Sequence, residues 1–318
     1  MKKITMRSNQ VSRQSLTLEE AFGQFIKMCT LKNLSPKTIE TYEWHYKILV
    51  KYLDGNTPIS EIDRNVIDDY IIHLKQSGTI RDITINTYLR SIRVFLYYLM
   101  KQNLMDEFVI QMLKVDKIIK ETYTDPELKL LLKKPDIKTC DFTEYKTWVF
   151  SNYLLATGNR ISSVLGIRIK DLDFTNYLIN VTKTKNRKAQ IIPMSKVLAS
   201  ILLEYMQYRN GEEDDYLFCN SYGEMGNIHT FEGLLQRYNR KRGVAKTSAH
   251  LYRHTFAKNW IINGGDIFRL QKILGHSDLT VVKEYVNMFS NDLSIDFDKF
   301  NPLDNMNIAF DRKAIGMR

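Results

Sequence analysis

Basic and aromatic side chains that could take part in catalysis are grouped in the C-terminal third of the chain. His250 and Arg253 are three residues apart, His276 follows in a Leu-Gly-His-Ser sequence, and Tyr285 comes nine residues later. Three of the six histidines fall within 27 residues. Upstream, Arg160 stands in a Thr-Gly-Asn-Arg sequence. Together these residues supply two guanidinium groups, imidazoles and a phenol, which are groups that could act on a phosphodiester.

Breaking a phosphodiester without a metal ion requires a nucleophile, positive charge for the phosphoryl oxygens, and an acid for the leaving oxygen. An arginine can bind two phosphoryl oxygens at once and keeps its charge. Arg160 and Arg253 are therefore candidates to stabilise the transition state. Tyr285 is the candidate nucleophile and would hold the phosphate covalently. Because a free phenol titrates near pH ~10, His250 is the candidate base, and His276 is a candidate donor to the phosphate.

Other common catalytic motifs do not occur in this sequence. It has no GxxxxGKS or GxxxxGKT phosphate loop, no HExxH, no DxDxDG and no GxGxxG after a strand. Its three cysteines, Cys29, Cys140 and Cys219, lack CxxC spacing, which disfavours a disulfide scaffold or a cysteine-rich zinc site. We therefore expect neither a metal nor a cofactor.

The charge of the chain points to a polyanionic partner. The sequence contains 46 lysines and arginines against 36 acidic residues, a net charge of +10. Residues 1–120 have 18 basic and 13 acidic side chains, and residues 121–318 have 28 and 23, so each part has an excess of +5. Duplex nucleic acid is the usual polyanion that both parts of a chain contact. The longest apolar run, Val94–Met100, is far too short to cross a bilayer, so we expect a cytoplasmic protein.

Residues 16–113 are typical of a small helical bundle. Thr17 and Glu20 can form a capping box, in which each side chain accepts a hydrogen bond from the other residue's backbone N–H. Ser35 precedes a proline at the first position of the next helix. Apolar side chains then recur every three or four residues in four segments, the second of which should stop at Asp54. Short connections between four helices predict a bundle.

A second domain should begin after residues 114–121, which contain three lysines and little that could form a core. Thr124 and Glu127 can form another capping box there. Helical patterns follow, then two strand candidates, Tyr177–Val181 and Gln190–Ile192, joined by a basic turn. The other features are a third strand candidate, Tyr216–Phe218, and a helical pattern from Phe231 to about Asn287. The sequence thus predicts a mainly α fold with a small antiparallel β-sheet.

The set of Arg160, the His250-x-x-Arg253 pair, His276 and Tyr285 resembles the active site of the tyrosine recombinases, also called the phage-integrase family. The resemblance covers most of the chain. It implies a four-helix SAM-like core-binding domain that binds DNA and an α+β catalytic domain. The implied parts are a basic N-terminal arm (1–15), the core-binding domain (16–113), a linker (114–121), the catalytic domain (122–290) and a C-terminal tail (291–318). The tail would pack on a neighbouring subunit or, alternatively, on its own domain.

The resemblance also implies the acid. Family members place a lysine eight residues before a proline that closes the hairpin, and eight residues before Pro193 is Lys185. Lys183, two residues away, is the competitor. Many relatives carry Glu or Asp three residues after the first arginine, whereas this chain has Ser163, which can accept a hydrogen bond but supplies no charge. His254 is expected to support the fold by packing or capping and receives no chemical role.

Further basic residues are candidates for contact with the phosphate backbone. The alternative to DNA contact is that these side chains merely face solvent, on a turn for the first group and at a helix end for the second. The candidates are Lys183, Arg187 and Lys188 on the hairpin turn, and Arg237, Arg240, Lys241, Arg242 and Lys246 shortly before His250.

The resemblance implies a site-specific DNA recombinase that cuts and rejoins DNA through a 3′-phosphotyrosine intermediate and exchanges strands through a Holliday junction. The expected partners are double-stranded recombination sites, three further copies of the chain in a tetramer on two sites, and an accessory DNA-bending factor. We expect a bacterial, nucleoid-associated protein of a mobile genetic element. The alternatives are a Xer-like dimer resolvase, a type IB topoisomerase-like nicking and closing enzyme, and a non-catalytic DNA-binding regulator.

Overall fold

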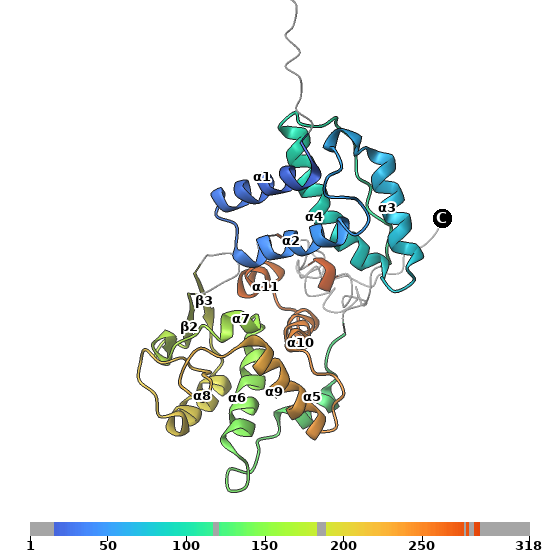
Figure 1. Cartoon of the computed structure of the whole chain (residues 1–318). Helices are drawn as coiled ribbons and strands as arrows, with labels where there is room; N and C mark the ends of the chain where they lie inside the picture. The colour runs from blue at the N-terminus through green and yellow to red at the C-terminus, as the bar shows by residue number, and fades with distance from the viewer. Residues whose placement is uncertain (1–15, 117–120, 183–188, 277, 280–282, 287–318) are drawn as a thin grey trace, which may run out of the picture. The chain divides into compact units, whose positions relative to one another are not determined.

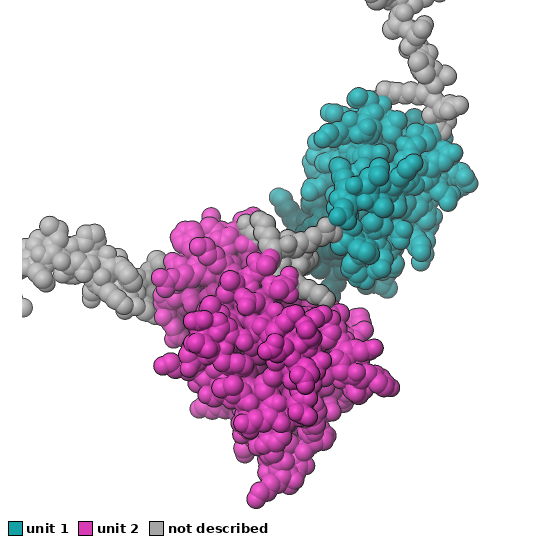
Figure 2. Space-filling view, turned by 90° about the vertical axis from the view of Figure 1, so that its left-hand side faces the viewer, with its two compact units in different colours: residues 1–118 teal, residues 119–318 magenta. Residues whose placement is uncertain are grey.

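The chain divides into two compact units, residues 1–118 and residues 119–318 (Figures 1 and 2). Each unit has its own hydrophobic core. The computed structural model describes residues 16–116, 121–182, 189–276, 278–279 and 283–286.

Several predictions from the sequence lie outside the described residues. These are the N-terminal arm, the tail from residue 291, and the hairpin turn with Lys183, Lys185, Arg187 and Lys188. They stay predictions, as do the limits of the linker and of the two domains.

Residues 16–116 form the predicted four α-helices. Thr17 N–H donates to the Glu20 carboxylate at 3.0 Å, and Glu20 N–H donates to the Thr17 hydroxyl at 3.2 Å, so the predicted capping box exists. The Ser35 hydroxyl caps the second helix, whose first residue is a proline. The helices are α1 (Leu18–Leu31), α2 (Pro36–Leu49), α3 (Arg64–Gln76) and α4 (Asp82–Lys101).

Helix α2 ends at Leu49, earlier than the predicted stop at Asp54. The reason lies at the start of α1, because the first N–H groups of a helix have no partner inside it. Leu18 N–H donates to Thr57 O at 2.9 Å, and Glu19 N–H donates to Gly55 O at 3.0 Å. The chain therefore leaves the helix after Leu49 and runs beside the first turn of α1.

Helix α6 (Phe142–Thr157) is the central element of the second unit and is buried on nearly all sides. It contacts α5, α8, α9 and α10, which surround it in Figure 1. A helix that is apolar all round is typical of a core position. The helices of this unit are α5 (Asp125–Leu132), α6, α7 (Ile161–Val164), α8 (Lys196–Arg209), α9 (Ile228–Lys241), α10 (Ala249–Ile262) and α11 (Ile267–Leu274).

The predicted hairpin is part of a three-stranded antiparallel sheet in the order β1-β2-β3. Its strands are β1 (Leu172–Asp173), β2 (Leu178–Val181) and β3 (Gln190–Pro193). Ile179 pairs with Ile192 at the centre of the hairpin.

The third strand prediction, Tyr216–Phe218, is wrong, because β1 takes that place in the sheet. Tyr216 forms an isolated bridge with Arg168. Leu217 N–H donates to Ile167 O at 2.9 Å. The segment therefore satisfies its backbone groups beside residues 167–169 and does not extend the hairpin.

The capping box at Thr124 should contribute measurably to the stability of the second unit. Thr124 N–H donates to the Glu127 carboxylate at 2.8 Å, and Glu127 N–H donates back to the Thr124 hydroxyl at 3.4 Å. Thr124→Ala should lower the free energy of unfolding by about 1 kcal/mol, because a helix cap typically contributes that much. Urea unfolding of the whole chain measures this loss.

Thr175→Ala is the matched control, because Thr175 is exposed in a turn of the same unit. A surface change of this kind should alter the unfolding free energy by less than about 0.5 kcal/mol. Equal losses in the two variants would show that the cap at Thr124 has no special weight.

Candidate active site

A buried arginine joins two separate segments of the second unit to its own helix, α10. Arg253 lies on α10 and is 5% exposed. Its guanidinium donates to Gly158 O at 2.8 Å, to Leu274 O at 2.9 Å and to His276 Nε2 at 2.6 Å. Because a guanidinium has no acceptor atom, Nε2 must accept, and the neutral imidazole then has its proton on Nδ1.

The first of these segments is the tight turn between α6 and α7. Gly158 ends α6 in the left-handed region, at φ 62°. A Cβ atom there would lie 2.6 Å from Phe256 and 2.9 Å from Leu274, so both the backbone angle and the space favour glycine. The turn places Arg160 at the N-cap of α7. Ser163, the departure from the family pattern, is buried on α7.

The second segment is the end of α11. Gly275 closes this helix at φ 62°, and His276 follows it. The side chain of Gln190, the first residue of β3, donates to Lys272 O and, at 2.7 Å, to Ile273 O. The hairpin is therefore attached to the turn that carries His276.

Tyr285 lies in a helical segment, residues 283–286, and is 1% exposed. Its Oη is 2.7 Å from His254 Nδ1. Burial raises the pKa of the Tyr285 phenol, while the positive charges of Arg253 and Arg160 act to lower it. The phenol and both guanidinium groups therefore interact within one chain.

The two arginines keep their charge in a poorly hydrated place. Burial lowers the pKa of Arg253 to about 10, and the charge of Arg160 acts in the same direction. Burial also lowers the pKa of Arg160. Both groups remain protonated at neutral pH. Two neighbouring cations at low local dielectric attract an anion strongly.

The structure thus brings Arg160, Arg253, His276 and Tyr285 together. His250 is exposed at the start of α10, with its ring centroid 6.4 Å from that of His254.

The sequence did not predict the contact between His254 and Tyr285. His254 was expected only to support the fold by packing or capping. A signal was present, because His254 follows Arg253 directly. It also lies four residues after His250, on the same side of a helix.

Three of the predicted DNA-contacting residues are engaged in ion pairs within the unit. Lys241 Nζ is 2.6 Å and Arg242 Nη1 is 3.0 Å from the carboxylate of Glu144. Lys246 Nζ is 3.1 Å from the Glu127 carboxylate. These partners compensate part of the positive charge, and contact with phosphate stays a prediction for all three residues.

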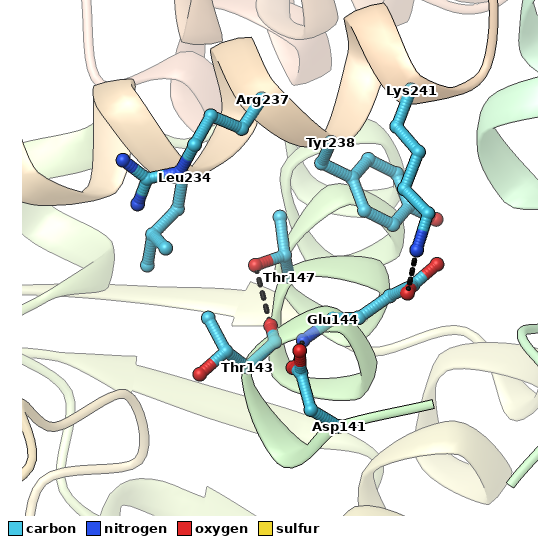
Figure 3. Close-up of a pocket in the computed structure, with 8 residues that line it drawn as sticks. All are labelled: Asp141, Thr143, Glu144, Thr147, Leu234, Arg237, Tyr238 and Lys241. Atoms are coloured by element: carbon cyan, nitrogen blue, oxygen red, sulfur yellow. Dashed lines mark hydrogen bonds and ion pairs between the residues drawn. The ribbon is translucent and has the colours of Figure 1, made fainter. Parts of the chain in front are cut away.

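Figure 3 shows the pocket between α6 and α9 at this place. Lys241 reaches Glu144 across it, whereas the guanidinium of Arg237 points away from that carboxylate. Arg240 is likewise exposed. Arg237 and Arg240 are therefore the better candidates for contact with a polyanion on this face.

The described part of the chain lacks two further features. Within it, no group of three or more His, Cys, Asp or Glu side chains is arranged to hold a metal ion. None of its helices has the length and apolar character needed to span a bilayer.

Comparison with known proteins finds related sequences over nearly the whole chain. The profile of the phage integrase family matches residues 121–291, and that of the phage integrase SAM-like domain matches residues 10–116. Transposase A from transposon Tn554 of Staphylococcus aureus is 28% identical over 333 aligned positions, which cover 89% of this chain and 91% of that protein. Tyrosine recombinase XerD of Listeria innocua is 25% identical over 288 aligned positions, which cover 85% of this chain and 94% of that protein.

Solved structures have the same fold. The Tn1549 transposon integrase in complex with transposon right end DNA superimposes with a TM-score of 0.73, at 23% identity over 88% of this chain and 96% of that chain. A lambda integrase dimer bound to a core site gives a TM-score of 0.70, at 14% identity over 87% of this chain and 98% of that chain.

The turn at Gly158 should be sensitive to a single methyl group. Gly158→Ala combines a left-handed backbone, which costs about 1–2 kcal/mol for a residue with a side chain, with contacts to Phe256 and Leu274 that are too short. We expect the free energy of unfolding to fall by about 2–5 kcal/mol, because overpacking adds about 1–3 kcal/mol to the backbone cost. Urea unfolding measures the loss.

Gly264→Ala separates the two causes. Gly264 has φ 73°, yet a Cβ atom there would have nothing within 4 Å. This control should lose only the backbone part, about 1–2 kcal/mol. If both variants lose the same amount, the close approach at Gly158 has no energetic weight.

The ion pairs of Glu144 should make stability depend on pH. Hydrogen bonds from Lys241 and Arg242 hold the pKa of the Glu144 carboxyl below its ordinary value, the bond from Lys241 being the largest cause. A lowered pKa in the folded state stabilises the protein above the ordinary value of about 4.3, and the effect is lost as the pH falls through the folded value.

Glu144→Gln should therefore lower the unfolding free energy by about 1–2 kcal/mol at pH 7, and the difference from the wild type should shrink below about pH 4. Urea unfolding at several pH values measures this. Glu232→Gln, which removes a carboxylate that is 44% exposed on α9, is the control. A Glu144→Gln difference that stays constant down to low pH would contradict the role of the charge.

Proposed function

Because the chain belongs to the phage integrase family of tyrosine recombinases, we propose that it exchanges DNA strands through a covalent bond to Tyr285. The enzyme is a site-specific recombinase. The observation that supports Tyr285 as the nucleophile is its buried phenol, which interacts with Arg253 and Arg160 of the same chain.

Arg160 and Arg253 are suited to the charge that develops during the reaction. A phosphodiester carries one negative charge, and the five-coordinate phosphorane formed by attack of a phenolate carries about two. A pair of guanidinium groups therefore matches the transition state better than the ground state, which is the condition for lowering the barrier. The bonds from Arg253 to Gly158 O and Leu274 O fix its position before DNA arrives.

The chemical step conserves the phosphoester bond. Tyr285 Oη bonds to the phosphorus as its proton passes to a base, and the bond from phosphorus to the 5′-oxygen breaks. The products are a 3′-phosphotyrosyl ester and a free 5′-hydroxyl. In the reverse direction the 5′-hydroxyl of the partner strand attacks the same phosphorus and releases Tyr285, so rejoining needs no external energy source.

The remaining roles follow from the family resemblance. Lys185, with Lys183 as the alternative, protonates the leaving 5′-oxygen. His276 is the donor to the phosphate that the resemblance implies, a role that requires its Nε2 to carry a proton and to give up the bond from Arg253. His250 is the base predicted from the sequence. The contact from Gln190 to the end of α11 supports this arrangement, because it attaches the hairpin that bears Lys185 to the turn before His276.

Double-stranded DNA is the proposed partner. Each part of the chain has an excess of +5, and contacts with phosphates would make the affinity fall steeply with salt. The solved Tn1549 transposon integrase was captured with transposon end DNA, and this chain has the same fold. Strand exchange between two duplexes uses four cleavages, so we propose four copies of the chain on two sites, with an accessory DNA-bending factor as a further partner.

We propose that the recombinase serves a mobile genetic element. The likeness to transposase A from Tn554, at 28% identity over both units, supports this choice. XerD-type recombinases are related at 25% identity, so resolution of chromosome or plasmid dimers is the alternative. Recombination of the wild type on duplexes from the flanks of its own gene, compared with chromosomal resolution sites, distinguishes the two.

A covalent adduct tests the function. The probe is a library of duplexes with a randomised core, each nicked so that the short cleaved fragment diffuses away and the protein stays attached. After denaturation with detergent, the wild type should retain DNA, and the recovered sequences identify its site. Tyr285→Phe, which removes one oxygen atom, should reduce the adduct at least ~1,000-fold, because the nucleophile is absent.

Tyr222→Phe is the matched control, because Tyr222 is 86% exposed in the same unit, and it should form the adduct at the wild-type rate. Noncovalent binding by Tyr285→Phe, measured by gel shift, should remain within about threefold of wild type. A wild type that binds DNA and forms no adduct would instead be a DNA-binding regulator. Adducts without exchange between two labelled sites would identify a topoisomerase-like activity.

A further inference from the structure

The imidazole of His254 lies against the phenol of Tyr285. Nδ1 and Oη are 2.7 Å apart, and the ring centroids are 5.7 Å apart. This distance is within the range of a hydrogen bond. It is also within the reach that a general base requires to the proton that it removes.

Three aromatic rings form a row that leads from the surface to the nucleophile. His250 is exposed, His254 is half-buried, and Tyr285 is 1% exposed. The rings of His250 and His254 are 26° from parallel, with centroids 6.4 Å apart. The row makes His254 the ring between the exposed histidine and the buried phenol.

The phenol donates this hydrogen bond when the imidazole carries its proton on Nε2. Burial raises the pKa of Tyr285, so its oxygen is protonated at neutral pH and can donate. A neutral imidazole with its proton on Nε2 accepts at Nδ1. An imidazole titrates near pH ~6.5 in water, which suits a group that takes a proton at neutral pH and later returns it.

We propose that His254, and not His250, accepts the phenolic proton of Tyr285 during cleavage. This inference rests on the proposed function. The O–H bond of Tyr285 breaks as an N–H bond forms at His254 Nδ1, and Oη bonds to phosphorus. The 5′-oxygen leaves with a proton from the lysine of the hairpin. When a 5′-hydroxyl attacks in the rejoining step, the proton on His254 returns to Oη.

The charges around His254 would couple this proton transfer to DNA binding. Arg253 is its neighbour in the chain, and Arg253 and Arg160 both act on Tyr285, as does Glu284 with the opposite sign. Without DNA, the two guanidinium groups disfavour a third positive charge on the imidazole. A bound phosphate offsets their charge, so the imidazolium becomes favourable when the scissile phosphate is in place.

Two substitutions at His254 test the proposal. His254→Ala removes both the hydrogen bond and the base. His254→Asn places an amide near the position of Nδ1, so it can keep a hydrogen bond to Oη but cannot take a proton. The measurement is the single-turnover rate of adduct formation on a duplex recovered with the wild type, and both variants should be slower by ~10²–10⁴-fold.

A modified substrate separates the base from the acid. A duplex with sulfur in place of the bridging 5′-oxygen releases a thiolate, which leaves without protonation. Lys185→Ala should therefore recover cleavage on the sulfur duplex, whereas both His254 variants should stay slow. On the ordinary duplex, the wild-type rate should fall as acid protonates the imidazole, and this dependence should be absent in His254→Asn.

Control measurements distinguish a folding defect from a loss of proton transfer. Each His254 variant should bind the duplex noncovalently, and unfold in urea, like the wild type. His229→Ala, which removes an exposed histidine of α9, should cleave at the wild-type rate.

The proposal is overturned if His254→Asn cleaves like the wild type, because the contact then merely orients the phenol. It is also overturned if both His254 variants keep the wild-type rate, or if the sulfur duplex restores them. These outcomes differ from failure of the proposed function, in which the wild type itself forms no adduct at Tyr285.

Discussion

Burial of the Arg253 guanidinium is the constraint on which the site depends. A buried charge is costly unless hydrogen bonds satisfy it. The partners here are Gly158 O, Leu274 O and His276 Nε2, which are neutral groups. They satisfy N–H groups of the guanidinium and leave its positive charge uncancelled. The same bonds therefore stabilise the second unit and retain a charge that can act on an anion.

The two backbone partners of Arg253 stand at the ends of helices. Gly158 is the C-cap of α6, and Leu274 is the last residue of α11. Carbonyl groups at a helix C-terminus lack partners within the helix and form the negative end of its dipole. A cation is favourable at such a place. Both helices end in a left-handed glycine, so Arg160 and His276 follow close to Arg253.

The basic residues of α9 show how the same side-chain types serve a different purpose. Lys241 and Arg242 share the carboxylate of Glu144, which lies in the first turn of the buried helix α6. Their charges are partly compensated within the unit. In the candidate active site, the side-chain hydrogen bonds of Arg253 go to neutral groups. Environment, and not residue type, separates a structural cation from one that is available to a phosphate.

Local signals predicted much of the fold. The capping boxes at Thr17 and Thr124 were found from the sequence because they depend on residues three positions apart. The hairpin was found for a similar reason. The end of α2 and the third strand were predicted wrongly. Both depend on hydrogen bonds to distant segments, such as Leu217 N–H to Ile167 O, which local propensity does not contain.

The sequence by itself determined which groups are available: two arginines, two histidines and a tyrosine at spacings that resemble one family. The tertiary structure decided which of them touch. His254 follows Arg253 in the chain, and its contact with Tyr285 depends on how a segment 31 residues later returns to α10. Spacing along a chain defines chemistry by type, whereas a proton moves between two atoms only when folding brings them within hydrogen-bond distance.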